Sequence, residues 1–132
     1  MVEFSLVMPL LLIVMTGMVS YGLAMRNFLV LTNGVNSGAQ TLAMSRGQTT
    51  DPCATAYAAI ESSAPSLTAT SLSLTVVING TSFSSTSCPS GAADMVQGTT
   101  ALVTAAYPCS LAIYGMSDHA CSLSAQSAEL IQ

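Results

Sequence analysis

The feature that constrains this chain most is an uncharged apolar run close to its start. Residues 4–25 (FSLVMPLLLIVMTGMVSYGLAM) contain no Asp, Glu, Lys or Arg. A helix of this length spans roughly 30 Å, the thickness of the hydrocarbon layer of a membrane. A buried core helix needs a larger chain to enclose it, and a cleavable secretion signal needs a basic start, whereas this chain starts MVEF. We therefore predict a transmembrane helix over residues 1–25.

The residues that flank this run carry little positive charge that could set its orientation in the membrane. Arg26 is the only flanking cation, and it lies on the far side of the run. Positive charges normally mark the cytoplasmic side of a membrane helix, so Arg26 alone would place the wrong end inside. We therefore expect that a basic leader segment is removed from a precursor.

The helical pattern continues beyond the apolar run as an amphipathic segment over residues 26–47. Four apolar residues recur at steps of three and four, while polar residues fall on the other faces. Gly47 marks the expected stop, giving one helix of about 45 residues and roughly 70 Å. The apolar positions are Leu31, Val35, Ala39 and Leu42, and the polar ones are Asn33, Ser37, Gln40 and Ser45.

Four glycines and a proline weaken this helix and need compensation. Each of Gly17, Gly22, Gly34 and Gly38 costs roughly 1 kcal/mol relative to Ala, and Pro9 removes one backbone hydrogen bond. The Gly34-x-x-x-Gly38 spacing lets another backbone approach, either that of the chain's own head or that of a helix in another subunit. Around Gly17 and Gly22 the chain is either helical or opens into an extended segment.

Residues 48–132 are expected to form a small globular head. Asp51 and Pro52 fit the N-cap and first position of a short helix with one apolar side, and Asn79-Gly80 is a strong hairpin signal. The apolar side of that helix comprises Ala54, Tyr57, Ala58 and Ile60. In chain order we expect a helix from 52 to about 64, strands over 71–78 and 81–85, a loop over 84–98, and strands over 100–107 and 121–131. The resulting fold class is α+β, an antiparallel-sheet head packed on the outer half of a long N-terminal helix.

The four cysteines all lie in the head, and their even number indicates two disulfides in an oxidising compartment. Of the three connectivities we favour Cys53 with Cys88 and Cys109 with Cys121. The second pair would close a short loop between the last two strands and stabilise it by roughly 3 kcal/mol. A zinc site is disfavoured because no C-x-x-C occurs, and His119 beside Asp118 is interpreted as a loop-tip residue.

Composition excludes several function classes. Only 6% of the residues are charged, with 2 Lys+Arg against 6 Asp+Glu and a net charge of -4, so nucleic acid is not an expected partner. We find no catalytic motif and expect neither an enzyme nor a cofactor. Asn79-Gly80-Thr81 matches an N-glycosylation sequon, although the hairpin turn already explains this dipeptide.

Glu3 is the one unexplained charge, because an acid at the lip of an apolar helix needs a cationic partner, such as the amino terminus of a neighbouring copy. The N-terminal segment VEFSLVMPLLLIVMTGMVSYG contains a glutamate, an aromatic residue and then a proline. In this pattern it resembles TadE-like pilins of the tight-adherence branch of type IV pili. A prepilin peptidase cuts such precursors. The family's glutamate commonly stands fifth in the mature chain and here stands third, so either the cut lies closer to Glu3 or Met1 is not the native first residue. The resemblance implies that Glu3, with Met1 and Phe4, registers subunits during assembly.

The resulting hypothesis is a structural subunit of an extracellular type IV-like filament used in adhesion or surface attachment. The resemblance implies that subunits wait in the inner membrane, interact with an assembly platform there, and then pack their helices into a homopolymer. Two alternatives remain: a minor or priming pilin of the same machinery, and a single-pass membrane-anchored binding domain.

Overall fold

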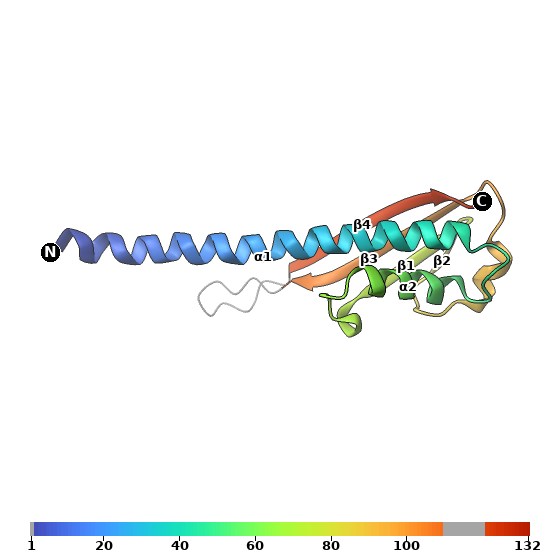
Figure 1. The fold of residues 1–132 in the computed structure, drawn as a ribbon, viewed down its shortest axis with the longest axis horizontal. Helices are drawn as coiled ribbons and strands as arrows, with labels where there is room; N and C mark the ends of the chain where they lie inside the picture. Colours follow the sequence, from blue (N-terminus) through green and yellow to red (C-terminus); the bar gives the residue numbers. More distant parts are fainter. Residues whose placement is uncertain (1, 110–120) are drawn as a thin grey trace.

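The protein is built on a single long helix with a small sheet beside one half of it. The computed structural model describes residues 2–109 and 121–132, with side chains from Val7 onward. Helix α1 (Val2–Met44) runs the length of the molecule, and Figure 1 shows the other elements gathered along the half that is nearer its C-terminal end. The predicted α+β class is therefore confirmed. We call residues 2–25 of α1 the inner half, residues 26–44 the outer half, and residues 48–132 the head.

The outer half of α1 buries the face that the periodicity predicts. Leu31, Val35, Ala39 and Leu42 are all fully buried. The helix ends at Met44, slightly before the predicted stop, and Gly47 follows with a φ of 73°. The sequence predicts that Ser45 lies on the polar face, but it is buried. Its hydroxyl donates to the carbonyl oxygen of Leu42 at 2.8 Å, which satisfies one of the free carbonyls at the helix end.

Helix α2 (Pro52–Ser63) packs beside the outer half, and its start is built as the sequence predicts. Asp51 is the N-cap, with an extended backbone, and its side chain accepts a hydrogen bond from the Ala54 N–H at 3.1 Å. Pro52 occupies the first helical position, where the missing N–H is not needed.

The buried face of α2 is only partly the predicted one: Ile60 is buried and Tyr57 packs half-buried against the core, as predicted, but the alanines differ. Cys53, Ala56 and Ile60 are buried, whereas Ala54 and Ala58 are exposed. The disulfide at Cys53 and the packing of Ile60 on α1 fix the rotation of the helix. Alanine methyl groups add little apolar area, so they gave a weak signal for the buried side.

The sheet has four antiparallel strands in the order β2-β1-β3-β4. Strands β1 (Ser73–Ile78) and β2 (Thr81–Phe83) form the predicted hairpin, with Asn79 and Gly80 at φ 50° and 85°. Positive φ at both central residues is the type I′ geometry, which an Asn-Gly pair favours. Strands β3 (Thr100–Cys109) and β4 (Cys121–Leu130) pair along their whole length.

The described part of the head also contains two short 3-10 helices, η1 (Ala69–Ser71) and η2 (Pro89–Asp94). The second lies inside the segment that the sequence predicts to be an irregular loop. Its Gly91 is buried and packs closely: an added Cβ would come within 3.2 Å of Pro52 Cγ and 3.3 Å of Cys88 Sγ. This close contact joins η2 to the start of α2.

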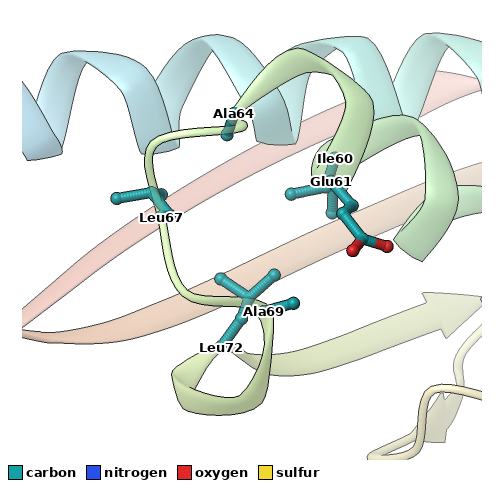
Figure 2. Close-up of a pocket in the computed structure, with 6 residues that line it drawn as sticks. All are labelled: Ile60, Glu61, Ala64, Leu67, Ala69 and Leu72. Carbon is teal, nitrogen blue, oxygen red and sulfur yellow. The ribbon is translucent and has the colours of Figure 1, made fainter.

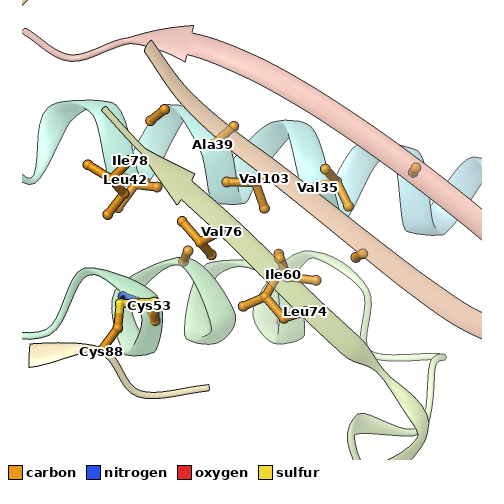
Figure 3. Close-up of a cluster of buried hydrophobic side chains, with 14 of the residues drawn as sticks. Val35, Ala39, Leu42, Cys53, Ile60, Leu74, Val76, Ile78, Cys88 and Val103 are labelled. Atoms are coloured by element: carbon orange, nitrogen blue, oxygen red, sulfur yellow. Dashed lines mark hydrogen bonds between the residues drawn. A yellow bond between two sulfur atoms is a disulfide. The ribbon is translucent and has the colours of Figure 1, made fainter. Parts of the chain in front are cut away.

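The core lies between the inner face of the sheet and the two helices (Figure 3). Alternate residues of β1 and β3 point into it, with Val76 and Val103 as directly paired neighbours. The alanines of β3, which weaken its strand propensity, are small inward-facing residues: Ala101 and Ala105 are fully buried. Small side chains here let α1 lie close to the sheet, so a weak strand signal has a packing reason.

Candidate functional site

Except near its C-terminal end, where Ser20, Leu23 and Ala24 line a hollow together with Tyr107, Pro108 and Cys109 of β3, the inner half of α1 is an apolar surface that no other element of the described structure covers. Its large side chains from Val7 to Met25 are all exposed, and Met18 and Tyr21 reach 70%. The most apolar 18-residue window has a mean hydropathy of 1.9, and none of it is buried in the protein. By length and composition this helix can cross a membrane, and large exposed apolar surfaces mark contact with lipid or another protein.

Glu3 lies in the first turns of α1, at the N-terminal end of this surface. Phe4 follows it in the same helix, and for both residues only the backbone is described. Met1 lies outside the described residues. The helical register alone places Glu3 and Arg26 at the two ends of the uncharged run.

Pro9, Gly17 and Gly22 do not interrupt the helix. The backbone is helical through all three positions, with Pro9 inside it. A Cβ added at Gly17 or Gly22 would meet nothing within 4 Å. In this structure, therefore, the two glycines leave open notches on an exposed helix and do not mark an extended segment.

Gly34 and Gly38 instead contact the protein's own head. A Cβ on Gly34 would lie 3.3 Å from Ala64 Cβ, and one on Gly38 would lie only 2.7 Å from Ile60 Cγ1. The second distance is shorter than real Cβ contacts allow. Of the two interpretations left open for this glycine pair, packing of the head on α1 accounts for both positions, because α2 occupies the notch.

Two disulfides join the head, and they are the two pairs favoured from the sequence. Cys53–Cys88 connects the start of α2 to the residue before η2, across 35 residues of sequence, with Cα atoms 5.3 Å apart. Cys109–Cys121 connects directly paired positions of β3 and β4, with Cα atoms 5.0 Å apart. The first disulfide therefore links separate elements, whereas the second closes one end of a hairpin.

Asp51 connects α2 to the segment before η2 beside the first disulfide. Its carboxylate accepts hydrogen bonds from the Cys88 N–H at 2.8 Å and the Ser87 hydroxyl at 2.5 Å, besides the Ala54 N–H. Desolvation raises the pKa of Asp51, but these hydrogen bonds outweigh it and hold that pKa below its ordinary value. Asp51 thus has a structural role at neutral pH as an ionised cap.

Asn79 stands exposed at the tip of the β1–β2 hairpin. Its positive φ and the following Gly80 give the turn a full structural explanation. Glycosylation at this asparagine stays a prediction.

The described residues hold no group of three or more His, Cys, Asp or Glu side chains placed to bind a metal ion. Asp118 and His119 lie outside the described residues. Figure 2 shows a hollow in the head between α2 and η1, lined by apolar side chains and Glu61. Its volume is about 10 Å³, room for about one water molecule, so it is too small for an organic substrate.

Comparison with known proteins relates the inner half and most of the outer half of α1 to one family. Residues 1–40 match the family model described as TadE-like protein. No curated protein and no solved structure matches the chain. The match confirms the resemblance seen in the N-terminal motif and indicates a Tad pilus-related protein with an N-terminal apolar helix. The matched region contains the whole exposed apolar surface and none of the head.

Proposed function

We propose that this protein is a pilin, a structural subunit that polymerises through the inner half of α1 into an extracellular type IV-like filament of the Tad type. The observation that carries the proposal is the separation of the apolar surface from the core. The head and the outer half of α1 share one buried cluster of residues, and no residue of the inner half belongs to it. An apolar helix that the fold does not need is available first to lipid and then to copies of itself.

The proposed assembly starts in the inner membrane. Residues 1–25 span the bilayer, residues 26–47 connect to the head, and residues 48–132 lie outside as a disulfide-stapled unit. A prepilin peptidase trims the precursor, and an assembly platform moves subunits from the lipid into the filament. Repeated head-to-tail contacts that do not close into a ring then extend a helical fibre.

Glu3 has a specific role in this proposal. A carboxylate that enters a packed apolar core needs a cationic partner, since an unpaired buried charge costs several kcal/mol. The amino terminus of a neighbouring subunit can supply that partner, with Met1 and Phe4 placed beside it. A subunit in correct register would gain this pair, whereas a misplaced one would leave Glu3 unpaired.

The head provides the outer surface of the filament and serves adhesion or surface attachment. It carries five acidic residues and no Lys or Arg over residues 48–132, a low charge density for its length. The role is structural rather than catalytic, and it uses no cofactor.

Shearing of cells tests the proposal directly. The filaments released into the medium are imaged, and their dominant small protein is sequenced from its N-terminus. We expect this chain as the bulk component, beginning close to Met1. Recovery only from the membrane fraction would contradict the proposal and favour a membrane-anchored binding domain, while trace amounts in filaments built from another subunit would favour a minor or priming pilin.

A further inference from the structure

Helix α1 carries only two charged residues, and they lie at opposite ends of its uncharged run. Glu3 precedes the run and Arg26 follows it. They are 23 positions apart, which corresponds to about 35 Å along a helix axis. The two charges therefore cannot pair within one copy, although each is the only opposite charge that the other has on this helix.

Both charges belong to the surface that assembly would cover. Arg26 is exposed. Breaking a buried pair by removing one partner is strongly unfavourable, whereas removing both partners is much better tolerated. A guanidinium also matches a carboxylate with two parallel hydrogen bonds.

We propose that Arg26 of one copy is the counter-ion of Glu3 in a second, parallel copy, and that this pair fixes the axial displacement between the two at about 35 Å. The inference rests on the proposed function, since it names the partner and register of the same helix surface. It adds to the contact between Glu3 and a neighbouring amino terminus, because a carboxylate has two oxygens and accepts from both donors.

The surface of the outer half fits this displacement. With Glu3 level with Arg26, the inner half of the second copy lies along the exposed positions that follow Arg26. Asn33 and Gln40 share the helical face of Arg26, and both are exposed. Every residue between Arg26 and Arg46 is uncharged. An apolar helix can therefore run along this face without meeting an unpaired charge.

Gly17 provides a second match at the same displacement. Gly17 lies fourteen residues after Glu3, as Gln40 lies fourteen after Arg26, so each pair shares a helical face and the two meet at one level. A Cβ added at Gly17 would meet nothing within 4 Å. This open notch would receive the long Gln40 side chain, which gives a packing reason for a glycine that the single copy does not need.

Variants that remove the charge at position 3, position 26 or both test whether the two residues interact. Filament yield in the sheared fraction is measured relative to the amount of protein in the membrane for Glu3→Gln, Arg26→Gln and the double variant. We expect Glu3→Gln to lose filaments by about tenfold or more, because Arg26 is left unpaired, and Arg26→Gln to lose fewer, because Glu3 keeps the neighbouring amino terminus. The double variant should recover yield above Glu3→Gln, because no unpaired guanidinium remains. Arg26→Lys should retain much of the yield, and Arg46→Gln, which removes the other exposed cation beyond α1, is the matched control.

Cysteine cross-linking tests the displacement without altering the pair. Leu10→Cys and Asn33→Cys copies are co-assembled with wild-type copies, and the filaments are oxidised. Leu10 shares the face of Glu3 and Asn33 that of Arg26, each one heptad further along. We expect dimers from this combination, since a disulfide needs Cβ atoms about 4 Å apart. Gln40→Cys in place of Asn33→Cys lies about 10 Å further along the same face and should give none.

Three results would overturn the inference while leaving the proposed function intact: wild-type yield from Arg26→Gln, a double variant no better than the worse single variant, or filaments in which cysteines at positions 10 and 33 do not cross-link. Absence of filaments from the wild-type protein itself would instead contradict the proposed function.

Discussion

The two halves of α1 share one continuous backbone but have opposite surroundings. In the outer half, the apolar residues Leu31, Val35 and Leu42 are fully buried under the sheet and α2. In the inner half, equally apolar residues such as Leu10 and Val19 are about two-thirds exposed, at 65% and 64%. Apolar character alone therefore does not say where a residue is buried, and among the described residues most of the inner half stays uncovered.

The glycines make the same comparison at the scale of single atoms. The space beside Gly38 is occupied by Ile60 of α2, whereas the space beside Gly22 is open. The missing side chain at Gly38 makes room for Ile60, whereas the room left at Gly22 is not used within one copy. The difference separates contacts that hold one copy together from contacts that are free to be made between copies.

The largest effect is expected from substitution of Glu3, at the N-terminal end of the inner half. Glu3→Ala should leave the protein in the membrane, since it removes a charge next to the apolar run, but should abolish or greatly reduce filaments. Membrane fractionation and sheared-filament yield measure the two properties separately. Glu61→Ala, which removes an exposed acid from the head, is the control. Unchanged filament yield in Glu3→Ala would remove Glu3 from the mechanism.

Loss of the Cys53–Cys88 disulfide should have the next largest effect, confined to the head. The chain-entropy relation gives about 4 kcal/mol for its loop and about 3 kcal/mol for the shorter Cys109–Cys121 loop. We therefore expect the Cys53→Ala/Cys88→Ala variant to melt at a lower temperature in detergent than Cys109→Ala/Cys121→Ala.

Reductant extends this test to assembled protein. Mild reduction should loosen the heads and leave the helical core of existing filaments intact, because no cysteine lies in α1. Wholesale disassembly under these conditions would show that the head and the helix are not energetically separate.

A matched pair of glycine substitutions sharpens the comparison between the halves. Gly38→Ala should destabilise the head by about 1–2 kcal/mol, since the new methyl group overlaps Ile60 and the gain in helix propensity offsets only part of that cost. Gly22→Ala should not lower the stability of the head, because its Cβ meets nothing. Thermal unfolding in detergent, followed by circular dichroism, compares them. Equal melting temperatures for both variants would contradict the assigned role of Gly38.

The smallest effect is expected from the cap of α2. Asp51→Ala should cost about 1 kcal/mol at neutral pH through the lost N-cap. The pKa of Asp51 is lowered in the folded protein, so its contribution is full above the pKa of the unfolded chain and is lost as the pH falls through the lower folded value. The difference in melting temperature between wild type and Asp51→Ala should therefore shrink in acid. Asp94→Ala is the control, and a difference independent of pH would argue against the ionised cap.

Local signals predicted much of the fold because they act over a few residues. The Asn79-Gly80 turn follows from the two dihedral angles that a tight hairpin requires, and the start of α2 follows from Asp51 and Pro52. The buried face of α2 followed only in part, at Tyr57 and Ile60, because alanines at 54, 56 and 58 give no usable apolar contrast. The short helix η2 was missed as well, since its Ser, Gly and Pro content is equally typical of a loop.

By itself the sequence determined that a long helix with an uncharged apolar half exists, where the strands and turns begin, and that Glu3 needs a partner. Periodicity, charge and turn chemistry are properties of the chain, so they can be seen before it folds. Only the tertiary structure decided which glycines pack against another element. Gly22 and Gly38 are the same residue type on the same helix, and they differ in whether α2 reaches them. It also decided that the core closes without the inner half, which depends on distances between elements far apart in the chain.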